Sequence, residues 1–203
     1  MICKAGVLLF YLPVMVNINI KVFLVLMLVL AAGCAPGGEA IKRDIEAHPE
    51  RGVFIKGVPL YRQERLMCGP SALTSVMKFY GKNTNAEEVA EKTFEERIKG
   101  TLAMDMVIYA KEAGFDARFY KGGLHDLKQN ITAGRPLILF LNLGVKSYPV
   151  GHYIVVVGYD EVSETVLAYT GAFRLDALGY KSLMRAWGKT GFSTILITPK
   201  EGL

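Results

Sequence analysis

An apolar helix that begins directly after Cys68 is the feature of this sequence that most constrains the fold. Gly69, Pro70 and Ser71 open the helix, because proline is tolerated in a first helical turn, and Gly81 ends it. The apolar residues between them cover most of the helix surface: Ala72, Leu73, Val76, Met77, Phe79 and Tyr80. A helix that is apolar on most sides is buried, so we expect this helix at the centre of the domain.

The elements that follow fall into a helical half and a strand half. Asn85 is a typical helix cap, and further helices are predicted over 101–113 and 124–133. Strands are predicted, after an extended stretch at 53–60, over 115–120, 136–141, 152–159, 166–169 and 192–198. Helices that lead and strands that follow indicate an α+β domain with an antiparallel sheet.

The start of the chain differs in composition from the rest. Of the 203 residues 51% are hydrophobic, and the excess is concentrated before residue 34. The apolar run 22–32, about 11 residues long, is short for a membrane-spanning helix but suits the core of a signal peptide. The run ends in LAAGC, which resembles the bacterial lipobox, where the signal peptidase cleaves before a cysteine that carries diacylglycerol. This cysteine is Cys34.

We therefore predict three parts: a signal peptide at 1–33, a lipidated Cys34 with a tether at 34–52, and the folded domain at 53–203. Met15 is an alternative start, because a chain that begins there carries a compact lipoprotein signal. An uncleaved N-terminal anchor helix is the other interpretation. In both cases the domain is attached to a membrane of the bacterial cell envelope and faces the periplasm or the exterior.

Charge and motifs exclude several classes of partner. The net charge of +5 is spread along the chain, and no basic run with interleaved aromatic residues indicates nucleic acid. The sequence has no HExxH or CxxC metal motif and no GxxxxGK phosphate loop, so we expect no metal, no other cofactor and no ATP site. Cys3, Cys34 and Cys68 share no disulfide-like or metal-like spacing, which leaves Cys68 as the one thiol of the predicted domain.

Three residues around the buried helix form a pattern that suits nucleophilic catalysis. Cys68 stands at the helix N-terminus, where free amides and the helix dipole stabilise a thiolate. Gln63, five residues upstream, can join the Cys68 amide in binding an oxyanion. His152, at the start of the strand HYIVVVGYD, can act as a base from a neighbouring element.

The runs VPLYRQERLMCGPSALTSVMKFYG and GHYIVVVGYD resemble the bacteriocin-leader-processing cysteine peptidases and their stand-alone relatives, a branch of the papain-like group. The stretch PLILFLNLGVKSYPVGHYIVVVGYD is further similar to a sub-group of bacterial lipoproteins with this domain. The resemblance covers about 58–199. It implies a papain-like fold, a peptide or protein substrate, Cys68 as nucleophile, His152 as general base and Gln63 as oxyanion donor.

The third catalytic position departs from the family pattern. Where the family has an Asp, usually followed by Pro, this chain has Thr170 followed by Gly171. A hairpin that turns near residue 161 places Thr170 opposite or diagonal to His152, where its hydroxyl can accept a hydrogen bond from Nδ1–H. Asp160 is a poor substitute, because eight residues of strand separate it from His152 by about 26 Å. Asp176 can return from the next loop, but the sequence does not fix it there.

Other residues have simpler interpretations. A lone cysteine is more often a small core residue than a nucleophile, and only the combination around Cys68 favours catalysis. We expect His48 and His125 to be solvated, Trp187 to be a core or rim aromatic residue, and Asn142 to form a turn rather than line a cleft.

The favoured function is hydrolysis of peptide bonds by a membrane-anchored cysteine peptidase. The same site can also carry out transpeptidation or deamidation, depending on whether water or an amine enters. Two further alternatives are a peptide-binding lipoprotein with weak catalysis, which Thr170 favours, and a structural envelope lipoprotein in which Cys68 only packs.

Overall fold

The computed structural model describes residues 37–61, 66–145 and 147–200. The predicted signal segment, Cys34 and Gln63 lie outside these ranges. Within the described ranges, no helix combines the length and the hydropathy that crossing a membrane requires.

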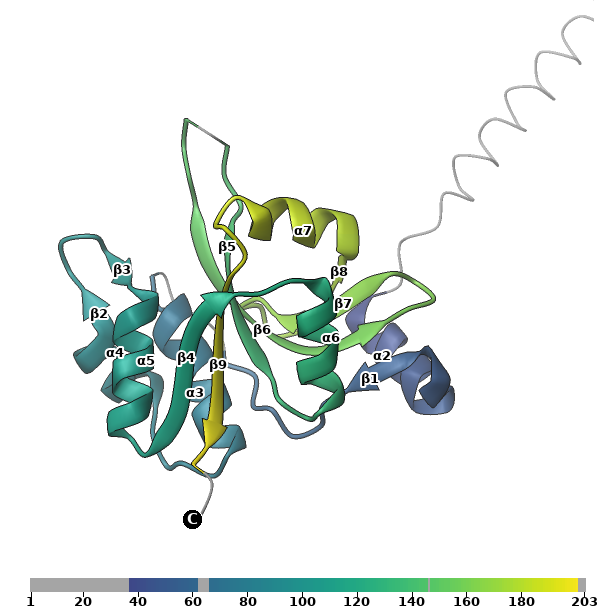
Figure 1. Ribbon diagram of the computed structural model, residues 1–203, viewed down its shortest axis with the longest axis horizontal. Helices are drawn as coiled ribbons and strands as arrows, with labels where there is room; N and C mark the ends of the chain where they lie inside the picture. The colour runs from purple at the N-terminus through teal and green to yellow at the C-terminus, as the bar shows by residue number, and fades with distance from the viewer. Residues whose placement is uncertain (1–36, 62–65, 146, 201–203) are drawn as a thin grey trace, which may run out of the picture. The chain divides into compact units, whose positions relative to one another are not determined.

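The larger of the two sheets in the described residues is antiparallel and has seven strands (Figure 1). Six of its strands follow the order β4-β9-β5-β6-β7-β8, and β1 pairs with β6. Their bounds are β1 Gly52–Phe54, β4 Phe115–Lys121, β5 Leu137–Asn142, β6 Gly151–Asp160, β7 Thr165–Tyr169, β8 Asp176–Gly179 and β9 Ser193–Pro199. The predicted antiparallel sheet is therefore confirmed, although of the extended stretch 53–60 only the first two residues belong to β1.

Strand β6 organises the sheet. Its first half pairs with β5, from Gly151 opposite Asn142 to Val156 opposite Leu137. Its second half pairs with β1 and, along the other edge, with β7 as far as Asp160 opposite Thr165. The run HYIVVVGYD is a continuous apolar stretch because β6 is covered on both faces, and its residues 153–158 are buried.

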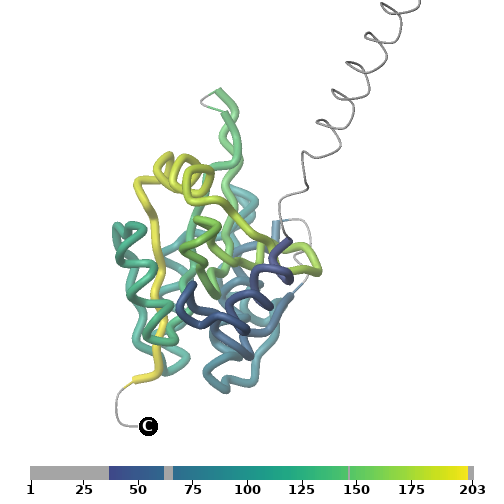
Figure 2. Tube along the Cα trace, turned by 90° about the vertical axis from the view of Figure 1, so that its right-hand side faces the viewer, coloured from purple at the N-terminus to yellow at the C-terminus, as the bar shows by residue number. Residues whose placement is uncertain are grey.

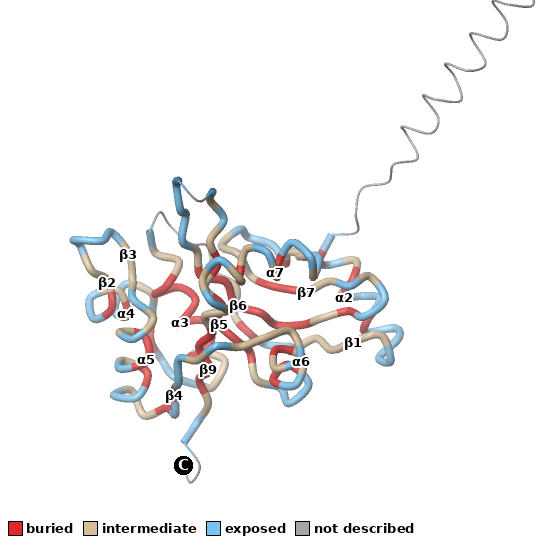
Figure 3. Tube along the Cα trace, turned by 45° about the horizontal axis from the view of Figure 1, so that its top comes forward, coloured by how far each residue is buried: buried red, intermediate tan, exposed pale blue. Residues whose placement is uncertain are grey.

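The helices are α2 Gly38–Ala47, α3 Cys68–Phe79, α4 Ala86–Thr93, α5 Ala103–Glu112, α6 Leu124–Thr132 and α7 Tyr180–Gly188, with a 3₁₀ turn η1 at Pro49–Arg51. Helix α3 is the central buried helix that the sequence predicts, since every residue from Gly69 to Met77 is buried (Figure 3). It packs against α4 and α5 on its flanks and against β5 and β6 of the sheet. Gly81 ends it in the left-handed region, at φ 86°.

Several elements were not predicted. A two-stranded hairpin, β2 Phe94–Glu95 and β3 Gly100–Thr101, precedes α5. Helix α7 and strand β8 follow β7. The hairpin is too short to give an alternating pattern, and YKSLMRAWG offers α7 only two buried residues, Leu183 and Trp187. Both segments are recognisable only from what they pack against.

Most of the predicted tether, from Gly38 onwards, is helix, 3₁₀ turn and strand that pack on the domain. Helix α2 packs against β1, β7 and β8 (Figure 2). Ile41 and Ile45 on its inner face are 1% and 5% exposed. The buried face of α2 carries only two large apolar side chains, Ile41 and Ile45, so this helix has a weak signal in the sequence.

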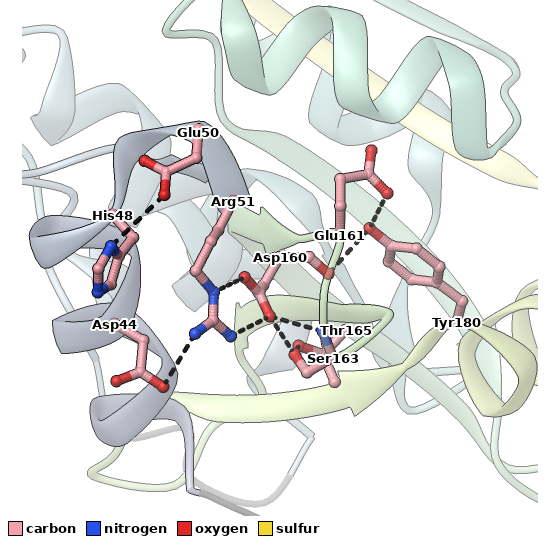
Figure 4. Close-up of polar contacts among 9 residues, drawn as sticks. All are labelled: Asp44, His48, Glu50, Arg51, Asp160, Glu161, Ser163, Thr165 and Tyr180. Carbon is pink, nitrogen blue, oxygen red and sulfur yellow. Dashed lines mark hydrogen bonds and ion pairs between the residues drawn. The ribbon is translucent and has the colours of Figure 1, made fainter.

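A buried carboxylate fixes the N-terminal segment to the far end of β6 (Figure 4). The Asp160 side chain is fully buried and accepts two hydrogen bonds of 3.1 Å from the Arg51 guanidinium. It also accepts a 2.8 Å bond from the Ser163 amide at the β6–β7 turn. Burial raises the pKa of Asp160, but the bonds from Arg51 and Ser163 outweigh it and the net pKa is lowered. Asp160 is therefore a structural anchor, as its distance from His152 along the strand implied.

If α2 is part of the domain, Ile41→Ala will destabilise the whole fold. Removing this buried side chain leaves a cavity, and we expect the free energy of unfolding to fall by about 2–5 kcal/mol. The matched control is Arg43→Ala on the exposed side of the same helix, which should change stability by less than about 0.5 kcal/mol. Urea unfolding of both variants measures this. If both substitutions change the free energy of unfolding by the same small amount, α2 does not contribute to the stability of the domain.

Candidate active site

Cys68 is the first residue of α3, and no side chain caps the helix N-terminus in front of it. The helix amides there are therefore free to act on the thiol or on a bound group. The backbone N–H groups of Gly69 and Tyr153 both donate to the Cys68 sulfur. Cys68 is only partly buried and packs against the core cluster, so its sulfur is held by the fold and still reachable.

His152 is the second residue of β6 and forms a side-chain hydrogen bond with Cys68. Helix α3 packs directly on β6, and this contact brings together two residues that are 84 positions apart in the sequence. The His152 Nε2 atom lies 2.8 Å from the backbone carbonyl oxygen of Thr170. Since Nε2 is occupied there, Nδ1 is the ring nitrogen that remains for the Cys68 sulfur.

The electrostatics favour a thiolate beside an imidazolium. Burial raises the pKa of Cys68, but the hydrogen bond with His152 and the amides of Tyr153 and Gly69 outweigh it, so the net pKa is lowered. Burial lowers the pKa of His152, but the bonds with Cys68 and the Thr170 carbonyl leave it raised. The two shifts have opposite signs, as expected for a pair in which each charge stabilises the other.

Thr170 lies at the third position, but its contact differs from the expected one in both atoms. The acceptor is the Thr170 backbone carbonyl rather than the hydroxyl, and the ring atom is Nε2 rather than Nδ1. The hydroxyl instead donates to the Asp176 carboxylate. Tyr169 pairs with Val155, so Thr170 is diagonal to His152 and the ring must extend along the sheet to reach it. At this offset the contact with the ring is made by the main chain, while the hydroxyl is engaged by Asp176.

Close contacts explain why glycine stands at positions 69 and 151, next to Cys68 and His152. A Cβ atom on Gly69 would lie 2.7 Å from Cβ of Thr101, where the first turn of α3 touches β3. A Cβ atom on Gly151 would lie 2.7 Å from the Phe140 ring, which packs over the start of β6. A side chain at position 69 would separate the first turn of α3 from Thr101, and one at position 151 would separate the start of β6 from Phe140. Both glycines therefore allow close packing next to Cys68 and His152.

A cleft of about 750 Å³ opens over Cys68 and His152. One wall comes from the β2–β3 hairpin and the start of α5, and the other from β4, β5, β6 and the residues after β7. Its apolar lining is Leu66, Ile98, Leu102, Phe119 and Phe140. Four of these five side chains are exposed, which is unusual for large apolar groups outside a binding surface. Sequence reasoning missed this wall; the one signal was the isoleucine within the charged run EERIKG.

The remaining sequence expectations fall as follows. Gln63 lies outside the described residues, so its contact with the oxyanion position stays a prediction. His48 and His125 are exposed, and Trp187 is fully buried with its indole N–H donating to the Ser193 carbonyl. Asn142 forms a turn, since its side-chain oxygen accepts from the amides of Gly144 and Val150 at 3.0 Å. In the described ranges no group of three or more His, Cys, Asp or Glu residues is arranged to hold a metal ion.

This chain belongs to the Peptidase_C39 like family, which matches residues 55–195. The sequence is also similar to an uncharacterized protein of Methanothermobacter thermautotrophicus, with 31% identity over 99 residues. That match spans 49% of this chain and 62% of the length of the archaeal protein.

Two solved structures confirm the papain-like fold of these peptidase domains. The peptidase domain of Streptococcus ComA, a bifunctional ABC transporter of a quorum-sensing pathway, superposes with a TM-score of 0.55 at 24% identity, covering 71% of this chain and 100% of that domain. A double glycine motif protease from an AMS/PCAT transporter, solved in complex with its leader peptide, gives a TM-score of 0.58 at 22% identity and covers 74% and 99%. At these identities the likeness establishes the fold alone.

The coupling between Cys68 and His152 can be measured by alkylating the thiol over a range of pH. In a chain with Cys3→Ser and Cys34→Ser, Cys68 is the one remaining thiol, and its lowered pKa should place the midpoint of the rate below the value of an unperturbed cysteine thiol. His152→Ala removes the hydrogen bond and leaves the effect of burial, so the midpoint should move above that value. His125→Ala is the matched control and should leave the profile unchanged. A midpoint that ignores His152 would show that the two residues are not coupled.

Proposed function

We propose that this protein is a thiol-dependent peptidase in which Cys68 is the nucleophile and His152 the general base and acid. The observation that carries the proposal is the interaction between these two side chains at the head of α3, where both residues line the cleft. Membership of a peptidase family supports the reaction class, and the opposite pKa shifts of the pair support its polarity.

In the proposed acylation step, the Cys68 thiolate attacks the carbonyl carbon of the scissile peptide bond. The negative charge passes to the carbonyl oxygen, and the Cys68 amide at the helix N-terminus can donate to it. We propose Gln63 as the second donor, from its place five residues before Cys68. The imidazolium of His152 then gives its proton to the leaving nitrogen, the C–N bond breaks, and a thioester on Cys68 remains.

Water completes the reaction. Neutral His152 takes a proton from a water molecule as its oxygen attacks the thioester carbon, the C–S bond breaks, and the carboxyl product leaves. The Thr170 carbonyl holds the imidazole during both steps, because it accepts the Nε2 proton and turns Nδ1 towards the sulfur. A carbonyl is a neutral orienting group, like the Asn of papain-like enzymes, and does not compensate the imidazolium with a full charge.

An extended peptide is the proposed substrate. The cleft is long enough to be walled by elements from β2 to β9, and its apolar side chains offer surface to peptide side chains on both sides of the pair. The related double glycine motif protease was solved with a leader peptide, which supports a peptide in this cleft. By that analogy we propose small residues, glycine or alanine, next to the scissile bond.

Cleavage of quenched fluorescent peptides tests the peptidase proposal. We expect the full-length chain, purified in detergent, to cut members of a library centred on Gly-Gly or Gly-Ala. Cys68→Ala and His152→Ala should each lower kcat/KM by about 10³-fold or more, since the two groups act as a unit. His125→Ala should keep full activity. The rate should rise as Cys68 ionises and fall at higher pH as His152 loses its proton.

The outcomes separate the alternatives. A thioester that is resolved by an added amine faster than by water would indicate a transpeptidase, and release of ammonia from a glutamine peptide would indicate a deamidase. Peptide binding that survives Cys68→Ala, with no cleavage by the unchanged chain, would indicate a binding lipoprotein. An unreactive thiol that binds no peptide would contradict the proposal altogether.

We also propose that the protein is anchored in the bacterial envelope by a lipid on Cys34. The apolar run 22–32 and the sequence LAAGC support this, and the folded domain begins only a few residues later at Gly38. The tether is therefore short, and cleavage would take place close to the membrane surface.

Metabolic labelling tests the anchor. Cells grown with an alkyne fatty acid should label the unchanged protein, and the label should disappear in Cys34→Ser and persist in Cys3→Ser. Intact mass should place the mature N-terminus at Cys34. An unlabelled protein that retains residues 1–33 would favour the uncleaved anchor helix instead.

A further inference from the structure

The carboxylate of Asp176 is connected to the Cys68–His152 pair through one residue, Thr170. The Thr170 carbonyl accepts from His152 Nε2 at 2.8 Å, and the Thr170 hydroxyl donates to an oxygen of the Asp176 carboxylate. The main chain of Thr170 thus contacts His152, and its side chain contacts Asp176. None of the sequence motifs indicates this linkage.

The position of the Thr170 carbonyl is not fixed by the sheet. The β6–β7 ladder ends with Tyr169 opposite Val155, and Thr170 is the first residue beyond it. The next residue, Gly171, has φ 98°, which a side chain would strain, and the chain bends from there until β8 begins. A carbonyl at such a point can rotate with its peptide plane, so another contact must hold it.

Asp176 is well placed to supply that contact. It opens β8, where it pairs with Ala168 of β7, and its side chain is 15% exposed. Its other carboxylate oxygen accepts from Arg174 Nε at 2.7 Å. The preceding Leu175 is 3% exposed, and a Cβ on Gly38 of α2 would lie 2.3 Å from the Leu175 carbonyl oxygen. The base of Asp176 is therefore fixed by the strand and by the N-terminal helix.

We propose that Asp176 is a positioning residue: it holds Thr170 through the hydroxyl, so that the Thr170 carbonyl orients His152 towards Cys68. This inference rests on the proposed function of the Cys68–His152 pair. A hydrogen bond to an ionised acceptor is stronger than one between neutral groups, which makes the carboxylate an effective anchor for a threonine. Two residues thereby replace the aspartate of the family pattern: Thr170 provides the acceptor for His152, and Asp176 holds Thr170 in the orientation that this requires.

Asp176 acts through Thr170 rather than by its own charge. The interactions that set the pKa of His152 come from Cys68 and from the Thr170 carbonyl, together with burial. Among the described residues, Lys99 of the β2–β3 turn and Tyr153 of β6 are the other ionisable groups that line the cleft around the pair. The charge of Asp176 is shared with Arg174, whose side chain is 75% exposed.

The test compares variants of the chain whose only thiol is Cys68. Thr170→Val is nearly isosteric and removes the hydroxyl but keeps the carbonyl, and Asp176→Ala removes the acceptor. Each should move the midpoint of Cys68 alkylation upwards by about half to one pH unit and lower kcat for peptide cleavage about tenfold, with KM little changed. The double variant should do no more than either single one, because both remove the same contact.

Two controls distinguish positioning from general structural support. Thr170→Ser restores a hydroxyl and should rescue the shift that Thr170→Val causes. Arg174→Ala removes the ion pair with Asp176 but leaves the Thr170 bond, so it should retain the unchanged profile. Thermal unfolding identifies any variant that has lost its fold. If Asp176→Ala unfolds, Thr170→Val carries the test by itself.

The result that overturns the inference is a Thr170→Val profile equal to that of the unchanged chain, while His152→Ala still shifts the midpoint. The Cys68–His152 pair would then stand without Asp176. If His152→Ala leaves the midpoint unchanged, the proposed pair itself fails, and this inference fails with it. Shifts that add in the double variant would also contradict the proposal, because they would show two independent contacts.

Discussion

The contact between α3 and β6 is the interaction on which the rest of the site depends. Helix α3 is buried along nine consecutive residues, from Gly69 to Met77, and β6 is the strand on which it rests. Because the helix is apolar on most sides and β6 is apolar on both faces, neither can move to the surface without exposing a large part of the core. Cys68 and His152 are thus brought together by the same burial that stabilises the fold, and Gly69 and Gly151 keep the neighbouring packing close.

The site has two levels of organisation. The Cys68 sulfur is surrounded by backbone donors, and the His152 ring has a backbone acceptor, so the main chain supplies most of the hydrogen bonds around the pair. Main-chain groups do not depend on the identity of a side chain, and the usual aspartate of the third position is replaceable for this reason. Side chains return at the next level, where the Thr170 hydroxyl meets Asp176. In this arrangement His152 is oriented by the short loop that begins at Thr170 and by strand β8 after it, rather than by a single residue.

The N-terminal segment of the described domain packs beside this loop. Helix α2 lies outside the stretch 55–195 that the family shares, but it covers Leu175, next to Asp176, and it is tied by Arg51 to Asp160 at the end of β6. The residues between the proposed lipid and the domain are therefore few, and the first folded residues already support the active-site loop.

The sequence by itself determined the elements whose chemistry is local: the buried helix after Cys68, the apolar strand after His152, the α+β class and the role of Asn142 as a turn. Periodicity, proline and glycine carry that information within one segment. Only the tertiary structure decided which atoms meet. That Thr170 offers its carbonyl and gives its hydroxyl to Asp176, that Ile98, Leu102 and Phe119 form one cleft wall, and that α2 packs into the core all depend on strand offset and on packing between distant segments. A side-chain pattern does not encode the direction of a peptide plane. The sequence therefore predicted that Thr170 stands at the third position, but only the fold shows that its carbonyl oxygen makes the contact with His152.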